Sequence, residues 1–286
     1  MFVIAGVSGN TGSVVATELL ARGEKVRVIV RDAKKGEPWK AKGAEVAVAS
    51  LDDEAALAKA LAGASGAYLL SPPDLVSKDP IEEKRKQFEI LAGAVEKAKV
   101  PHVVFLSSIG AQHANGTGMI RTVHIGEERL AKTSAKLTFI RAAYFLDNWR
   151  AVLSAAEHGK LPSFLPADLR IPMVATKDIG LVSAGALLEG PPAEKTRVIE
   201  LAGPVDYDAT AIAAAVASIV GKPVAADVAP VEAVVPTYQS FGMSAEVATL
   251  FREMYEGIAN GTVAFEGKGA RHVRGKVDAA AALRPA

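Results

Sequence analysis

The sequence of 286 residues contains no cysteine, which excludes disulfide bonds, thiol catalysis and cysteine-ligated metal. The five histidines are scattered without a metal-ligand spacing, so we expect no metal site. Aromatic residues make up only 6% of the chain, which disfavours a surface that stacks on bases. The net charge is only +1, and no overall field attracts a polyanion. We therefore expect no nucleic-acid partner and no membrane association.

Long apolar runs are also missing, although half of the residues are hydrophobic. No stretch reaches the roughly 18 uninterrupted apolar residues of a membrane span. The first residues, MFVIAG, enter a short apolar run without a basic segment, and we expect no signal peptide and a cytoplasmic protein. The chain is long enough to bury a sizeable core.

Short apolar runs alternate with longer helical patterns through the first two-thirds of the chain. Continuous apolar strands between helices indicate a parallel sheet that is covered on both faces. We predict an α/β fold, a Rossmann-type doubly wound parallel sheet, whose ligands bind at the carboxyl ends of the strands. The expected strands are 2–5, 25–30, 45–49, 66–70, 102–107, 137–140 and 197–203.

The pattern changes after about residue 145. We assign 1–150 to the dinucleotide-binding Rossmann domain, with 175–203 returning to it. A smaller α+β substrate lobe comprises 151–174 and 204–286. The segment 176–190 reads as a helix capped by Thr176 or Asp178, and the Ala-rich last dozen residues are expected to fray.

The loop GVSGNTG, residues 6–12, follows the first strand and opens the first helix. Glycines permit a tight turn and a close approach of backbone to a pyrophosphate, and the helix N-terminus offers free N–H groups. The alternative is a tight turn without a ligand. With a strand before it and a helix after it, the loop predicts a phosphate site formed by Gly6, Ser8, Gly9, Asn10, Thr11 and Gly12.

The end of the second strand indicates which dinucleotide binds. An acidic residue there bonds the ribose of NAD, whereas an arginine accommodates the 2′-phosphate of NADP. Arg31 comes first, followed by Asp32, Lys34 and Lys35. The cationic cluster, above all Arg31 and Lys35, favours NADP(H). Asp32 keeps NAD(H) open as the alternative.

Three further strand ends face the same crevice, in SLDD (50–53), LSPPD (70–74) and SSIG (107–110). We expect Asp52 near the adenine, although Asp52 or Asp53 could instead cap the following helix. The rigid 70–74 loop should pass the ribose and nicotinamide. The cofactor candidates from these ends are Asp52, Ser71, Pro72 and Ser107.

Five segments together resemble the NmrA-like family of atypical short-chain dehydrogenase/reductases. They are GVSGNTG, VRD, SLDDEAALAKALAG, VPHVVFLSSIGA and LTFIRAAYFLDN, in this order and spacing. The nearest subgroup holds NAD(P)H-dependent quinone and dye reductases, and residues 236–261 resemble its C-terminal lobe, with a helix over the substrate cleft. Other family members bind NADP without turnover and act as redox sensors through protein partners.

The resemblance also implies roles for the stretch after the sixth strand, which contacts the nicotinamide and its ribose in this family. Here it reads Arg-Ala-Ala-Tyr-Phe, without the usual glycine. The alternative for its aromatic residues is ordinary core packing. The cofactor contacts implied here are Arg141, Ala142, Tyr144 and Phe145.

The segment HIGEERL, residues 124–130, stands where many short-chain reductases carry a Tyr and a Lys four residues apart. That pair supplies a proton to oxygen while hydride reaches carbon. Here the pair is His124 and Glu128, which share one helix face. His124 could donate a proton, bind substrate or cofactor, or pair with Glu128 structurally. His124 and Tyr144 are the catalytic candidates.

The leading prediction is an NADPH-dependent reductase of quinone-like or conjugated aromatic acceptors. A silent NADP(H) sensor that acts through a protein partner is the alternative. A quinone tolerates the loss of the Tyr/Lys pair, because its reduced anion is stable and can take a proton from water. The remaining candidates for the acceptor pocket are Ser108, His113, Asn148, Trp149, Tyr238 and Phe241.

Overall fold

The computed structural model describes residues 1–284 and contains a parallel sheet of eight strands. Their order across the sheet is β13-β10-β6-β5-β4-β1-β2-β3. All seven expected strands are present within three residues at each end, which confirms the doubly wound sheet. The strands are β1 (Phe2–Ile4), β2 (Val26–Val30), β3 (Glu45–Val48), β4 (Gly66–Leu69), β5 (His102–Ser108), β6 (Lys136–Ala142), β10 (Thr196–Ala202) and β13 (Arg271–Arg274).

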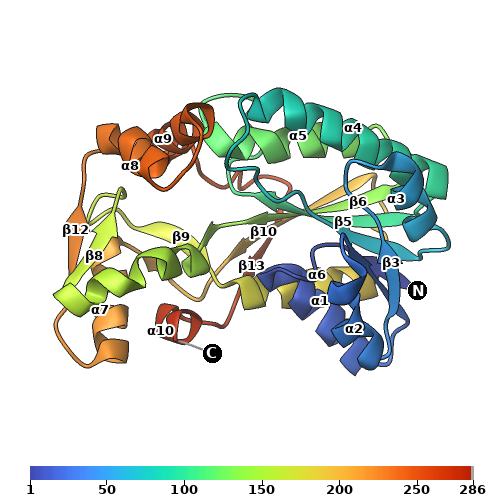
Figure 1. Ribbon diagram of the computed structural model, residues 1–286, viewed down its shortest axis with the longest axis horizontal. Helices are drawn as coiled ribbons and strands as arrows, with labels where there is room; N and C mark the ends of the chain where they lie inside the picture. Colours follow the sequence, from blue (N-terminus) through green and yellow to red (C-terminus); the bar gives the residue numbers. More distant parts are fainter. Residues whose placement is uncertain (285–286) are drawn as a thin grey trace.

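Helices cover both faces of the sheet (Figure 1). One layer holds α1 (Asn10–Ala21), α2 (Glu37–Ala41) and α6 (Thr176–Glu189), and the other holds α3 (Glu54–Leu61), α4 (Pro80–Ala98) and α5 (Arg121–Leu130). Ile4 and Tyr68 are buried in the core beneath α1 and α6, and Val3 and Phe105 in the core beneath α4. Such two-sided burial explains why the strands read as continuous apolar runs.

A smaller lobe extends from the carboxyl edge of the sheet, with its own core around the buried Trp149 (Figure 1). A long 3₁₀ segment, η3 (Leu146–His158), begins it. Short sheets then join β7 (Tyr144–Phe145), β9 (Ile171–Val174) and β11 (Asp206–Tyr207), and β8 (Lys160–Ser163) with β12 (Ala225–Val228). Its helices are α7 (Ala209–Val220), α8 (Val234–Ser240), α9 (Ala245–Ala259) and α10 (Ala279–Leu283), with a 3₁₀ turn, η4 (Val231–Ala233), before α8.

Two expectations for the C-terminal region are wrong. We assigned 204–286 wholly to the smaller lobe, but β13 pairs with β10 and forms the edge of the main sheet. Its sequence RHVR is too polar to read as a buried strand. The chain end does not fray through 284, because Asp278 caps α10 and Leu283 is buried in the core of the smaller lobe. Residues 285 and 286, which the same expectation covered, lie outside the described residues.

The capping of α6 also differs from the prediction. Neither Thr176 nor Asp178 is its N-cap; the distant Asp147 accepts hydrogen bonds from the Thr176 backbone N–H at 2.9 Å and from its hydroxyl at 2.8 Å. Asp178 instead accepts the N–H groups of Lys276 and Val277 at 2.9 and 2.8 Å. Both carboxylates thus connect parts of the chain that are remote in sequence, which local capping rules cannot anticipate.

Across residues 1–284, no helix is both long and apolar enough to cross a bilayer. The same described residues contain no group of three or more His, Asp or Glu side chains that could hold a metal ion.

His102, at the start of β5, is a titratable side chain buried in the core, and its burial makes the stability of the protein depend on pH. Its ring is 1% exposed and lies 3.0 Å from the Thr138 hydroxyl. Burial, assisted by the charge of Arg197, lowers the pKa of His102 to about 4. Between the unfolded value near 6.5 and about 4, the unfolded chain binds a proton that the folded chain does not. Stability should therefore fall as pH drops through this window.

Replacing His102 with Gln removes this titration. We expect the variant to lack a pH-dependent loss on the order of 3 kcal/mol between pH 6.5 and 4, measured by urea unfolding at several pH values. His113→Gln, in an exposed loop, is the control and should keep the wild-type pH profile. If the free energy of unfolding falls with pH equally in His102→Gln and in the wild type, His102 is not held neutral in the folded protein.

Candidate functional site

A cavity of about 880 Å³ lies at the carboxyl ends of the central strands. The strand order reverses between β1 and β4, and such a switch point is where a doubly wound sheet binds its ligand. Residues at or just beyond the ends of five different strands line the cavity, namely Ser8, Arg31, Asp52, Ser71 and Ser107. The sheet thus gathers residues that are about 100 positions apart in the sequence into one site.

The glycine loop forms one end of this cavity, lined by Gly6, Ser8, Gly9, Asn10 and Thr11. Helix α1 starts here with Gly9 as N-cap and no side-chain cap, so its first N–H groups are free to meet an anion. A Cβ on Gly9 would meet only the Gly6 carbonyl oxygen, at 3.4 Å, which leaves open space in front of the helix. These features fit a pyrophosphate.

Gly12 has a different role from the one predicted. It does not line the cavity, and a Cβ there would lie 2.5 Å from the carbonyl oxygen of Ala5. Its place is therefore set by the close packing of α1 against β1. The third glycine of the loop permits the helix to approach the strand, while the first two border the cavity.

Two cations line the next part of the cavity, Arg31 at the end of β2 and Lys35 in η1 (Ala33–Gly36). Within residues 1–284 neither side chain makes a hydrogen bond or ion pair. Asp32 does not line the cavity; its carboxylate caps η1 by accepting the Lys34 N–H at 2.9 Å. Asp32, the residue for which NAD(H) remained the alternative, therefore caps η1 instead of lining the cavity. Arg31 and Lys35 line it.

The side of the cavity beyond β3 and β4 is a connected polar surface. Gln87 donates to Asp52 at 3.0 Å and accepts from the Ser71 hydroxyl at 2.7 Å. The buried ammonium of Lys84 donates to Ser71 at 2.8 Å and to the Pro72 carbonyl, and burial lowers its pKa. Asp53, not Asp52, caps α3. Sequence reasoning missed Lys84 and Gln87, because both lie in a charged helix with no distinguishing signal.

The opposite end of the cavity is apolar. Its wall comes from α9, from the loop and turn after β5, from the first turn of α5 and from Val263. These residues are Ile109, Met119, Ile120, Val123, Phe251, Met254, Ile258 and Val263. We expected the 236–261 region to cover the cleft, and α9 does so. The spacing of Phe251, Met254 and Ile258 at three and four residues was a helical stripe that could have identified them.

Few polar groups reach this apolar end. Asp147 and Thr176 are hydrogen-bonded to each other at the start of α6, which leaves Ser107, Ser108, Thr122, Tyr144 and Asn148 as polar neighbours. Phe145 and Ala143 also line the wall, whereas Ala142 does not. The Tyr144 ring packs edge-on against Trp149, with centroids 6.5 Å apart, and burial raises the pKa of Tyr144 to about 12. Its hydroxyl therefore stays protonated at neutral pH.

Several predicted pocket residues do not reach the cavity. Phe241 is 73% exposed, and His113 lies in an exposed loop. Trp149 and Tyr238 pack behind the wall in the core of the smaller lobe. Tyr238 sits on α8, one helix further from the cavity than α9, and a periodic pattern alone does not reveal that order.

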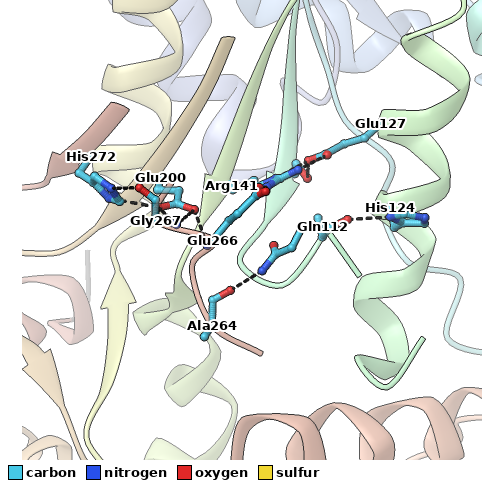
Figure 2. Close-up of polar contacts among 11 residues, drawn as sticks. Gln112, His124, Glu127, Arg141, Glu200, Ala264, Glu266, Gly267 and His272 are labelled. Atoms are coloured by element: carbon cyan, nitrogen blue, oxygen red, sulfur yellow. Dashed lines mark hydrogen bonds and ion pairs between the residues drawn. The ribbon is translucent and has the colours of Figure 1, made fainter. Parts of the chain in front are cut away.

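His124 also lies outside the cavity lining. Its Nδ1 donates to the Ala111 carbonyl at 2.8 Å (Figure 2). Its Nε2 is 3.7 Å from the Glu128 carboxylate. The side chain thus joins α5 to the loop after β5. Among the three interpretations of His124, this geometry favours the structural one.

Arg141 was expected to contact the cofactor, but the structure places it beside the cavity in a buried ion-pair network (Figure 2). It donates to Glu127 through Nε at 3.0 Å and through a terminal nitrogen at 2.7 Å, and to Glu266 at 2.7 Å. Ser107 donates to Glu127 at 2.5 Å. Arg141 therefore does not line the cavity; through Glu127 and Glu266 it fixes the positions of Ser107 and of the C-terminal segment.

This network predicts a specific pattern of stabilities. Arg141→Met leaves the Glu127 carboxylate, 8% exposed, without its partner, and should lower the free energy of unfolding by about 3–5 kcal/mol. Adding Glu127→Leu removes the orphaned charge and should restore a large part of that loss. Urea unfolding measures both, with Arg22→Met of the exposed Arg22–Glu18 pair as the control. A double variant as unstable as the single one would contradict a buried, coupled pair.

A glycine loop, a free helix N-terminus and two cations at the switch point of a parallel sheet define the dinucleotide-binding class of Rossmann fold. The chain belongs to the NmrA-like family, whose model matches residues 1–273. This confirms the resemblance drawn from the five sequence segments.

Individual relatives are distant but cover most of the chain. An NAD(P)H azoreductase from Xenophilus azovorans is 24% identical over 259 residues, 89% of this chain and 86% of its own. The NADPH complex of an NADPH-dependent quinone oxidoreductase from Escherichia coli superposes with a TM-score of 0.79 at 25% identity, covering 94% and 93% of the two chains. A Citrobacter sp. triphenylmethane reductase with NADP(H) gives 0.79 at 19% identity and the same coverage.

Proposed function

We propose that this protein is an NADPH-dependent reductase of quinone-like or other conjugated aromatic acceptors. The observation that carries the proposal is the continuity of one cavity, which joins a phosphate-binding loop and two cations to an apolar wall. A dinucleotide bound along it would have its phosphates at Gly9 and its far end beside Tyr144 and Ser107. An acceptor could then lie between that end and α9.

The choice of NADPH rests on Arg31 and Lys35. A 2′-phosphate is doubly charged and suits a guanidinium fork, whereas the NAD ribose needs a carboxylate acceptor. Asp32 is engaged as a cap and Arg31 faces the cavity. The azoreductase is named for NAD(P)H, and the two solved reductases are complexes with NADPH or NADP(H), which supports the same cofactor class.

The proposed chemical class of the acceptor follows from the apolar wall of the cavity. NADPH supplies a hydride when bound, and a low-polarity pocket keeps competing water away from the transfer. Met254 and Phe251 line this end and offer polarisable apolar contacts to an aromatic ring. Among residues 1–284, the one charged side chain that lines this end, Asp147, is engaged, so a neutral conjugated acceptor fits better than an ionic one.

Arg31→Glu tests the cofactor assignment. We expect NADPH affinity to fall by about 10–100-fold while NADH affinity changes little, because only the 2′-phosphate loses its partner. Fluorescence titration of the reduced nicotinamide measures both. Lys34→Glu, the same charge change on a neighbour that does not line the cavity, is the matched control. Equal NADPH affinity in Arg31→Glu and Lys34→Glu would show that Arg31 does not bind the 2′-phosphate.

Gly9→Val tests the reductase itself. Gly9 has extended backbone angles, φ −106° and ψ 178°, and open space beside it, so the variant should fold normally. We expect wild-type protein to oxidise NADPH only when a benzoquinone or naphthoquinone is present, with saturation, and Gly9→Val to lose this activity. Absorbance of the nicotinamide follows the reaction, and thermal unfolding checks the variant.

Tight NADPH binding by the wild type without turnover of any acceptor would contradict the reductase. It would support the alternative of a sensor that acts through a protein partner, and a difference in affinity between NADPH and NADP⁺ would strengthen that case.

A further inference from the structure

The side chain of Gln87, on α4, lies between a buried cation and an exposed carboxylate at one end of the cavity. Its amide oxygen accepts from the Lys84 ammonium at 2.9 Å and from the Ser71 hydroxyl at 2.7 Å. Its amide nitrogen donates to the Asp52 carboxylate at 3.0 Å. Gln87, Ser71 and Asp52 line the cavity, whereas Lys84, only 7% exposed, lies behind its wall.

The two charged neighbours fix the orientation of the Gln87 amide. An ammonium can only donate hydrogen bonds, so the amide atom that faces Lys84 is the oxygen. An ionised carboxylate can only accept them, so the atom that faces Asp52 is the nitrogen. A flipped amide would set donor against donor at one end and acceptor against acceptor at the other. The nitrogen of Gln87 therefore stays on the side of Asp52.

This arrangement leaves one donor and one acceptor side by side at the cavity. Within residues 1–284 the Gln87 amide nitrogen makes no hydrogen bond besides the one to Asp52, so its second hydrogen is available. Asp52 is exposed, and its other oxygen accepts only a long hydrogen bond, at 3.4 Å, from the Ser50 hydroxyl among these residues. The donor nitrogen and the nearer carboxylate oxygen are 3.0 Å apart. A ligand with a neighbouring acceptor and donor on one edge matches this pair.

The pair lies at the end of the cavity that suits adenosine. Asp52 follows β3, which pairs with β2, and Arg31 stands at the end of β2. In NADPH the 2′-phosphate, assigned to Arg31, is carried by the same ribose as the adenine. The base is therefore within reach of the neighbouring strand end. Ala49 and Leu51 line the cavity there and offer apolar contacts to the faces of a flat ring.

The edge of adenine complements the donor and the acceptor of this pair. Adenine carries an amino group, which donates, next to the ring nitrogen N1, which accepts. Hypoxanthine and guanine carry a carbonyl oxygen, which accepts, next to N1–H, which donates. Asp52 and Gln87 satisfy the first pattern, whereas both of them oppose the second. A site built to form hydrogen bonds discriminates against a ligand that leaves them unmade.

We propose that Gln87 is a specificity-determining residue for the base of the cofactor. Together with Asp52 it selects adenine over 6-oxopurines, and Lys84 and Ser71 hold its amide in the required orientation. This inference rests on the proposed function, because it takes NADPH as the cofactor. A dinucleotide with identical phosphates and nicotinamide but with hypoxanthine in place of adenine is then bound more weakly because of the base alone.

The first experiment compares NADPH with its hypoxanthine counterpart, which differs only in the base. Fluorescence titration of the reduced nicotinamide measures the affinity of both cofactors and needs no turnover. We expect the wild type to bind NADPH about 10-fold more tightly, because two hydrogen bonds at a partly exposed site are replaced by two repulsive contacts. Equal affinity for the two cofactors would overturn the proposal.

The second experiment exchanges the donor and the acceptor. Asp52→Asn combined with Gln87→Glu preserves size and net charge, and the new amide can donate to the new carboxylate, which also pairs with Lys84. We expect this double variant to prefer the hypoxanthine cofactor by about 10-fold. Asp227→Asn with Gln239→Glu, the same exchange at exposed positions of the smaller lobe, is the control and should keep the wild-type preference.

Thermal unfolding checks that each variant is folded. A folded double variant that still prefers adenine, or that distinguishes neither base, would overturn the proposed role of Gln87.

These readouts separate the two proposals. If the wild type binds neither cofactor, the cofactor assignment fails, and the reductase and the base selection fail with it. If the preference and its reversal are observed but no acceptor is reduced, only the reductase fails. If quinones are reduced and the two bases are not distinguished, only the base selection fails.

Discussion

The guanidinium of Arg141 is the group on which the geometry of this site depends. It lies at the end of β6, almost fully buried, and pairs with Glu127 of α5 and with Glu266 of the C-terminal segment. Glu127 in turn accepts from Ser107 at the end of β5. One cation thus joins two neighbouring strand ends, a covering helix and a segment more than 120 residues away. A buried pair of this kind adds little stability over an apolar core, but it penalises any arrangement that separates its members.

The same anchoring shapes the acceptor wall. Glu200, fully buried in β10, accepts the backbone N–H groups of Glu266 and Gly267 at 2.7 and 3.2 Å, and Gln112 donates to Ala264 at 2.9 Å (Figure 2). These bonds hold the segment beside Val263, which lines the cavity. The apolar wall is therefore built on a polar scaffold that lies behind it, and its own surface stays free of charge. This division suits a neutral acceptor.

Much of the fold could be predicted from sequence, since strands buried on both faces and the glycine loop are local patterns. The strand ends that line the cavity, Arg31, Asp52, Ser71 and Ser107 among them, follow from the topology of a parallel sheet. Residues whose role depends on distant partners could not be found in this way. Arg141 matches a family motif, yet its charge is taken by Glu127 and Glu266. Asp147 bonds to the start of a helix 29 residues away. The polar strand β13 was missed because an edge position does not require an apolar sequence.

Above all, we propose that an acceptor held against α9 receives hydride directly from the cofactor. A single-turnover measurement with NADPH deuterated on one or the other face of its reactive carbon tests this claim. With excess protein and a saturating naphthoquinone, we predict that deuterium on one face of that carbon slows the loss of nicotinamide absorbance, while deuterium on the other face leaves the rate unchanged. A rate that is the same for both labelled cofactors, or no acceptor-dependent loss at all, would contradict direct transfer in this cavity.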